Sequence, residues 1–168
     1  MVHDPKRNVT LLANKRGKRF VFNKDLQVID VITHDSQGNA ISRPYGISID
    51  SQGNYWVCDK DKGLFKITPT AGGYQTINIC HNDNEPYSLS SNAAYQAVED
   101  KQGNIWVATS GGGVNVIRKD KNGRYIALHY KNVMSRYPHN AHLKVRTIAL
   151  AKHGKVWAGS TDGILIKL

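Results

Sequence analysis

The three tryptophans of the chain occupy one position of an internal repeat, and this repeat constrains the fold more than any other feature. Trp56, Trp106 and Trp157 are separated by 50 and then 51 residues. In the first two copies the tryptophan follows an Asp-x-Gln-Gly-Asn turn, and the third copy, from Lys152, keeps the glycine but is one turn residue shorter. Self-similarity at this period is typical of architectures built from one repeated structural unit.

Short apolar segments flank each repeated turn and predict β-strands. They are rich in Val, Ile, Tyr and Trp and are bounded by Gly, Asn and Asp, which is the pattern of strands joined by tight turns. Four such strands per repeat of about 50 residues predict the blade of a β-propeller. The segments before the turns are Tyr45–Asp50, Tyr95–Asp100 and Val145–Leu150, and those after the tryptophan strands are Gly63–Ile67, Gly113–Ile117 and Gly163–Leu168.

The repeat predicts an all-β chain that forms a partial propeller of about three and a half blades of four antiparallel strands. Residues 43–81 and 93–130 each form a blade, whereas 8–34 and 144–168 form incomplete ones. A closed propeller needs roughly 4–8 blades. An open arc exposes an apolar face at each end and an unpaired sheet edge. We therefore expect the ring to be completed by further residues of a longer chain or by oligomerisation.

Composition and charge exclude several other classes of protein. The 168 residues suffice for one domain, and the net charge of +10 comes from basic residues that are spread along the chain rather than gathered as in nucleic-acid readers. No apolar run is long enough to cross a bilayer, and residues 1–5 do not begin a signal peptide. Cys58 and Cys80 lack zinc-type spacing, and Asp59-x-Asp61 lacks the further ligands of a calcium loop. We predict no metal and no cofactor.

The repeat resembles that of the two-component regulator propeller family. The residues that carry the resemblance are Asp100–Val114, the same unit at Asp50–Leu64 and Lys152–Ile164, and the connection His81–Asn92 with its Ser-Leu-Ser element. Cys58–Gly63 departs from the family's usual Gly-Thr-x-x-Gly turn. The resemblance implies the periplasmic sensor region of a membrane-anchored hybrid histidine kinase that senses oligosaccharides to control transcription. This segment contains no phospho-acceptor histidine motif and no nucleotide-binding glycine box, so it is not expected to be an enzyme itself.

A ligand is expected on the face that carries the D–A and B–C loops, where A is the innermost and D the outermost strand of a blade. A saccharide site needs aromatic faces for the ring and polar groups for the hydroxyls. The aromatic side chains Tyr87, Tyr95 and Tyr137, with neighbouring Asn and Arg residues, supply both. The residues predicted to contact the ligand are Arg43, Tyr45, Asn92, Tyr137, His139 and Arg146.

Two other functions remain open from the sequence. A propeller can bind a protein partner instead of a saccharide. The streptogramin lyases, a related propeller type, have similar turns and use a histidine with magnesium, for which His139 or His142 would be the candidates here. Sequence spacing places no acidic partner beside either histidine. The enzyme is therefore the weaker alternative.

Overall fold

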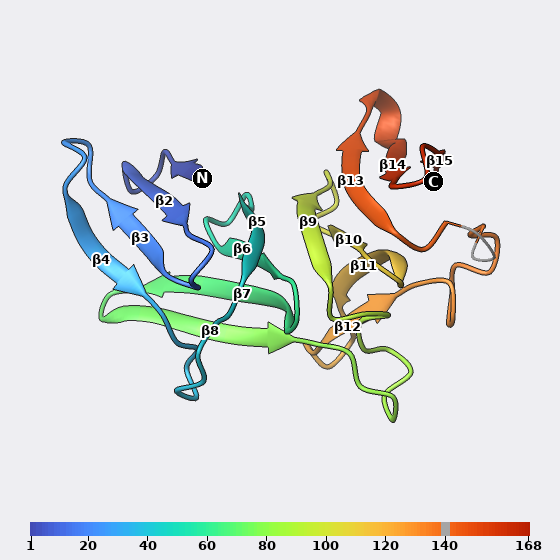
Figure 1. Cartoon of the computed structure of the whole chain (residues 1–168), viewed down its shortest axis with the longest axis horizontal. Helices are drawn as coiled ribbons and strands as arrows, with labels where there is room; N and C mark the ends of the chain where they lie inside the picture. The colour runs from blue at the N-terminus through green and yellow to red at the C-terminus, as the bar shows by residue number, and fades with distance from the viewer. Residues whose placement is uncertain (139–141) are drawn as a thin grey trace.

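The computed structural model describes residues 1–138 and 142–168, and within them fifteen strands form four antiparallel sheets (Figure 1). Each sheet uses consecutive strands in chain order, which is the arrangement of a meander. The first sheet contains β1 (Val2–Asp4), β2 (Val9–Ala13), β3 (Arg19–Phe22) and β4 (Val28–Ile32). The second contains β5 (Pro44–Ile49), β6 (Tyr55–Asp59), β7 (Gly63–Thr70) and β8 (Gly73–Ile79).

The third and fourth sheets repeat this plan. The third contains β9 (Ala94–Glu99), β10 (Ile105–Thr109), β11 (Gly113–Lys119) and β12 (Tyr125–Leu128). The fourth has three strands, β13 (Val145–Leu150), β14 (Val156–Ser160) and β15 (Leu165–Lys167), with a short 3-10 turn, η1 (Lys152–Gly154), between the first two. Within the described ranges no helix has the length and apolar character that crossing a membrane requires.

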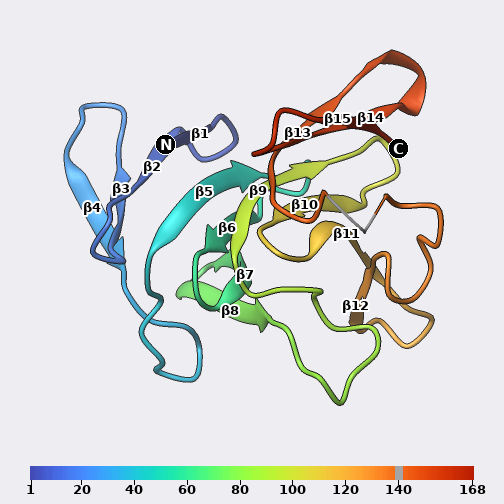
Figure 2. The same cartoon turned by 45° about the vertical axis from the view of Figure 1, so that its right-hand side comes forward.

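The first strands of neighbouring sheets pack against one another, so the sheets are arranged side by side around a common centre. β5 contacts both β1 and β9, and β9 contacts β13 (Figure 2). Within each sheet the later strands lie successively farther from this centre, as β5 to β8 show (Figure 1). This is the arrangement of propeller blades, and the predicted all-β fold with an incomplete arc of blades is confirmed.

The conserved geometry of the repeated turn comes from its aspartate. The Oδ1 atom of Asp50 accepts hydrogen bonds from the amides of Gln52 (3.0 Å) and Asn54 (2.8 Å), and Oδ2 accepts one from Trp56 Nε1 at 2.9 Å. Gly53 has a φ of 86°, which glycine adopts without the strain that other residues meet there. The carboxylate therefore closes the turn and also fixes the indole that follows.

The second repeat uses the same device and the last one does not. Asp100 bonds to the amide of Asn104 at 2.9 Å and to Trp106 Nε1 at 2.8 Å. In the last sheet the Ala151 amide donates to the Lys155 carbonyl at 2.8 Å, as the Asp50 amide does to that of Asn54 at 3.0 Å, so the third turn is not one residue shorter as the sequence suggested. Ala151 stands at the aspartate position, and η1 replaces the turn. Trp157 therefore lacks the carboxylate that orients the other two indoles.

Trp56 and Trp106 pack between neighbouring sheets, which confirms their predicted structural position. Trp56 is 2% exposed and lies in a cluster with residues of the third sheet, where its ring meets Tyr125 edge-on at 5.9 Å between centroids. Trp106 packs against the cluster that contains Val156 and Ile166 of the last sheet. Each indole thus joins its own sheet to the next one along the chain.

The first sheet extends beyond residues 8–34, for which the sequence predicts an incomplete blade. Val2–Asp4 precedes these residues, pairs with β2 and makes a sheet of four strands. The strand is short and ends in an acidic residue, so its pattern does not indicate a buried strand. Asp4 is nevertheless fully buried. Its carboxylate is stabilised there by hydrogen bonds from Tyr55 Oη at 2.8 Å and from Arg7 Nη1 at 2.7 Å.

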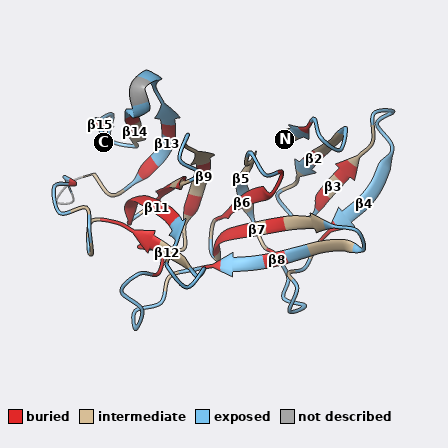
Figure 3. Ribbon diagram, turned by 180° about the vertical axis from the view of Figure 1, so that it is seen from behind, coloured by how far each residue is buried: buried red, intermediate tan, exposed pale blue. Residues whose placement is uncertain are grey.

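The two ends of the arc expose apolar side chains, as expected for unfinished blades. Leu12, Phe20 and Val31 form one cross-strand row on the first sheet, and Leu12 and Val31 are 37% and 39% exposed. On the last sheet Leu165 is 64% exposed. In Figure 3 the outer strand β4 is mostly pale blue, whereas β6 and β7 in the middle of the arc are largely red.

Close packing of the first strands predicts that Gly46 cannot be enlarged. A methyl group there would overlap the carbonyl oxygen of Tyr95 on the neighbouring sheet, so Gly46→Ala is expected to lower the free energy of unfolding by about 1–3 kcal/mol. Gly72→Ala is the matched control, because no atom lies within 4 Å of a methyl group at Gly72. Urea unfolding of both variants tests this, and equal stabilities would contradict the packing of β5 against β9.

Candidate functional site

Three equivalent positions on the first strands of neighbouring sheets form a continuous stack, which we call the inner-strand stack: Tyr45 on β5, Tyr95 on β9 and Arg146 on β13. The Tyr45 and Tyr95 rings are stacked, with centroids 4.7 Å apart and planes inclined by 30°. The Arg146 guanidinium carbon lies 3.8 Å from the Tyr95 centroid. Tyr45 is 49% exposed and Arg146 is exposed, so the stack presents an aromatic face and a planar cation to solvent.

The repeat itself builds this stack. Its members are separated by 50 and 51 residues, the same spacing as the tryptophans, and each lies near the start of the first strand of its sheet. Neighbouring copies of one position therefore meet when the sheets pack. The stack occurs at the end of the sheets that carries the connections into the first strands and the β6–β7 turn, because Pro44 pairs with Asp59.

A charged pair stands beside the stack on the same loops. Arg43 Nη2 lies 3.2 Å from Asp61 Oδ2, with side chains that are 62% and 47% exposed. The Arg43 carbonyl accepts a hydrogen bond from the amide of Lys60 at 3.0 Å, which holds the two loops together. Because both side chains are exposed, a ligand can reach them. An exposed ion pair contributes little to stability, so breaking it to bind a ligand costs little free energy.

A buried carboxylate, Asp59, holds the β6–β7 turn. Asp59 accepts hydrogen bonds from Ser42 Oγ (2.9 and 3.1 Å) and from the amide of Asp61 (2.9 Å), so its carboxylate is used inside the turn. Arg19 is fully buried nearby, donates to the carbonyl oxygens of Gly17 and Ile41, and has no partner for Nε or Nη2 among the described residues. Burial lowers the pKa of Arg19 to about 10, and the charge of Asp59 opposes this shift.

The predicted site residues fall into two groups in the structure. Tyr45 and Arg146 both contact Tyr95, and Arg43 precedes Tyr45 in the chain. Asn92 instead anchors a loop, since its Oδ1 accepts a hydrogen bond from the His81 amide at 2.7 Å. It also lines a cavity of about 310 Å³ together with Asp61 and Lys62.

Tyr137 and His139 lie in the last long connection. Tyr137 is 4% exposed, donates through its hydroxyl to the His142 carbonyl at 2.9 Å and packs against Gly113. Its burial, followed by the charge of Asp162, raises the pKa of Tyr137 to about 12. His139 lies outside the described residues.

Sequence reasoning missed the acidic partner of His142. His142 Nδ1 lies 2.8 Å from Asp162 Oδ2, across 20 residues of sequence, and Ser160 Oγ donates to the other oxygen of the same carboxylate. The hydrogen bond from Ser160, followed by that from His142, lowers the pKa of Asp162. In a catalytic triad the hydroxyl must bond to the imidazole that takes its proton. Here Ser160 bonds to the carboxylate, so the cluster does not activate a nucleophile.

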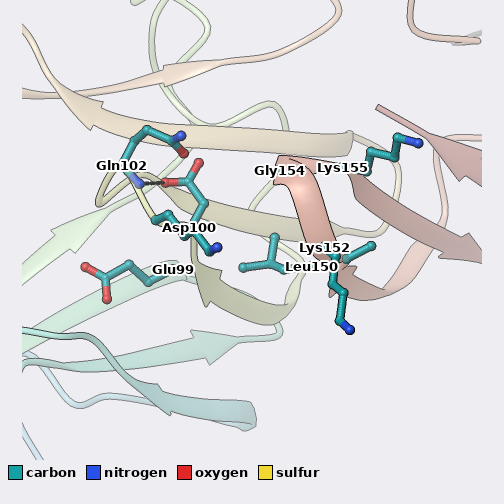
Figure 4. A pocket seen from close by; sticks show the side chains of 9 residues that line it. Glu99, Asp100, Gln102, Leu150, Lys152, Gly154 and Lys155 are labelled. Carbon is teal, nitrogen blue, oxygen red and sulfur yellow. Dashed lines mark hydrogen bonds between the residues drawn. The ribbon is translucent and has the colours of Figure 1, made fainter.

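A cavity of about 390 Å³ opens at the opposite ends of the third and fourth sheets (Figure 4). Figure 4 shows the side chain of Leu150 between Asp100 and Lys152. The Asp100 carboxylate already accepts hydrogen bonds within its own turn, including one from the Gln102 amide at 2.9 Å. The cavity therefore combines the apolar side chain of Leu150 with three lysines, Lys101, Lys152 and Lys155, and offers no aromatic ring, unlike the inner-strand stack.

Comparison with known proteins agrees with this architecture. Residues 88–111 match the family profile described as two component regulator propeller. One similar solved structure is the extracellular domain of BT4673 from B. thetaiotaomicron, which is described as a one component system. It has a TM-score of 0.73 and 19% identity over 99% of this chain. The extracellular domain of the hybrid two component system BT3049 from the same organism has a TM-score of 0.57 and 19% identity over 98% of this chain. The WD40 β-propeller domain of Doa1 has a TM-score of 0.66 and 14% identity over 99%.

The solved structures identify the fold of the chain, and the family profile identifies one of its repeats. At such low identity the solved structures show the fold alone, and that fold is a segment of a β-propeller. Residues 88–111 match a two-component regulator propeller repeat, which confirms the resemblance found in the sequence. It spans 23% of the BT4673 domain, 26% of the BT3049 domain and 48% of the Doa1 domain. No curated protein sequence matches it.

Proposed function

We propose that this chain is a ligand-binding segment of the extracytoplasmic, periplasmic sensor region of a hybrid two-component histidine kinase. The family match over residues 88–111 supports this proposal, as does the similarity to extracellular domains named as parts of such systems. The segment binds and does not catalyse. The kinase and the membrane anchor belong to the parent protein.

The ligand of this sensor is an oligosaccharide, and the inner-strand stack is the observation that carries the proposal. Tyr45 offers an exposed aromatic face for the apolar side of a sugar ring, and Arg146, which lies over the Tyr95 ring, offers several N–H donors for hydroxyl groups. Arg43 and Asn92 extend the polar lining, and Tyr137 and His139 belong to the adjoining connection. Because the stack joins three sheets, a bound ligand would contact several repeats at once.

Ligand binding acts on the assembly of which this segment is a part. The exposed apolar ends of the arc are covered by further blades of the parent chain or by a second copy, since surface of this kind marks an interface. A ligand that favours one arrangement of these units shifts the population of arrangements toward it. The paired kinase domains across the membrane then respond to that shift.

The test is a calorimetric screen of neutral oligosaccharides against the chain and its tyrosine variants. Tyr45→Ala and Tyr95→Ala are each expected to weaken binding by about tenfold or more, because truncating an aromatic anchor in a binding site costs this much. Tyr87→Ala is the matched control. The sequence offered Tyr87 as a further aromatic residue for the saccharide, but it is 51% exposed and lines a different cavity, together with Lys66 and Tyr125.

Three outcomes are informative. Loss of affinity in the two stack variants with unchanged affinity in Tyr87→Ala supports the proposal. Equal effects at all three tyrosines would place the saccharide elsewhere. Absence of binding to every saccharide would favour a propeller that binds a protein partner, and turnover of a ligand in the presence of magnesium would favour the lyase-like alternative.

A further inference from the structure

A groove runs between the outer strands of the second and third sheets and has no part in the proposed saccharide site. Its larger section has a volume of about 550 Å³, and a second section of about 410 Å³ shares Lys119 and Tyr125 with it and continues toward Trp56. Strands β7 and β8 form one wall, and β11 and β12 form the other. The lining of the larger section includes Lys66, Ile77, Cys80, Glu85, Lys119 and Tyr125.

Two ammonium groups from different sheets converge on one ring in this groove. Lys66 Nζ lies 5.4 Å and Lys119 Nζ 5.5 Å from the centroid of Tyr125. Lys119 is the cross-strand partner of Tyr125, whereas Lys66 reaches over from β7. The position of both charges is therefore set by the packing of the second sheet against the third.

The charge of these lysines is not neutralised by the protein. Neither Lys66 nor Lys119 forms a salt bridge with any residue that the structure describes. Arg124 has a partner, Asp120, at 3.3 Å, and Glu85 is the one carboxylate among the described residues of the larger section. A groove with two converging, unpaired cations attracts an anionic ligand.

The remaining lining favours a polypeptide over a sugar. Ammonium groups already cover Tyr125, so its ring does not offer an open face to a saccharide. Ile77 is 48% exposed beside the lysines and offers a contact for an apolar side chain. β8 is the outermost strand of its sheet and is exposed along much of its length (Figure 3), so an extended segment can lie along it.

We propose that this groove binds an acidic polypeptide segment, whose carboxylates pair with Lys66 and Lys119 and whose apolar side chains rest on Ile77. The segment is a second ligand of the propeller, separate from the inner-strand stack. Its binding does not depend on whether that stack receives an oligosaccharide.

Fluorescence anisotropy with a labelled peptide of alternating glutamate and valine tests this proposal. At low ionic strength the chain is expected to bind this peptide and not a glutamine–valine peptide of equal length. The double variant Lys66→Gln/Lys119→Gln is expected to bind about tenfold more weakly. The control Lys101→Gln/Lys155→Gln removes the same charge at exposed positions outside the groove and is expected to change affinity by about twofold or less.

The two cysteines supply an independent readout in the unaltered chain. Cys80 is exposed and lines the groove, whereas Cys58 is fully buried, so a maleimide reports on Cys80. The acidic peptide is expected to slow modification of Cys80. An unchanged modification rate with peptide bound, an equal loss of affinity in both double variants, or equal binding of the glutamine–valine peptide would each overturn the proposal.

Discussion

Trp56→Ala is expected to lower the free energy of unfolding by about 3–5 kcal/mol, because removing a buried tryptophan leaves a cavity that its surroundings fill only in part. The indole is 2% exposed, contacts Tyr125 of the next sheet and donates to Asp50. The substitution therefore removes packing between two sheets as well as a bond that closes the turn. Urea unfolding followed by circular dichroism measures the effect.

Trp157→Ala is the matched comparison, because Trp157 occupies the equivalent position in the last copy of the repeat. Trp157 is only half-buried, and Ala151 gives it no carboxylate, so its replacement is expected to cost about 1 kcal/mol. Equal costs at Trp56 and Trp157 would contradict the assignment of these residues to the middle and the end of the arc.

Asp4→Ala is expected to destabilise the chain by about 3 kcal/mol, because it leaves a buried hydroxyl without an acceptor and removes the counter-ion of an arginine. The Tyr55 hydroxyl, which is fully buried, would lose its acceptor, and Arg7 would lose its counter-ion at 2.7 Å. Asp25→Ala is the control: Asp25 is an exposed turn residue 3.9 Å from Lys24, and its loss is expected to cost about 0.5 kcal/mol or less.

The stabilisation by Asp4 should depend on pH in one direction. Burial opposes ionisation of Asp4, but hydrogen bonds from Arg7 and Tyr55 outweigh it and lower the pKa of the carboxyl. The contribution is therefore fully present above the ordinary pKa of an aspartate and is lost as the pH falls through the lowered pKa of the folded state. The stability difference between the chain and Asp4→Ala should shrink in acid. A difference that stays constant with pH would contradict this account of Asp4.

Most of the fold could be predicted from the sequence because its repeat is explicit. The spacing of Trp56 and Trp106 locates two full sheets. Each tryptophan follows a turn whose aspartate closes the turn and binds the indole, so the chemical cause of this motif can be read from the sequence. The strand Val2–Asp4 could not be predicted, since its burial depends on Tyr55, 51 residues from Asp4. A polar residue whose partners are distant in sequence resembles a solvated one.

The candidate site was predictable in its location but not in its contacts. Tyr45 and Arg146 follow from the loop topology of a propeller, whereas the role of Tyr95 as the ring between them depends on how closely the sheets pack. The pairing of His142 with Asp162 has the same origin. In each case residues from different sheets meet, and the sequence of one repeat does not specify its distance from the next.

Equivalent positions of successive repeats meet at the centre of the arc. A nuclear Overhauser measurement between the ring protons of Tyr45 and Tyr95 tests this arrangement most directly. Their ring centroids are 4.7 Å apart although 50 residues separate them. Strong cross-peaks between the two rings are expected, and they should vanish in Tyr95→Leu. Absence of these cross-peaks in a folded chain would mean that the repeats are not packed as neighbouring propeller blades.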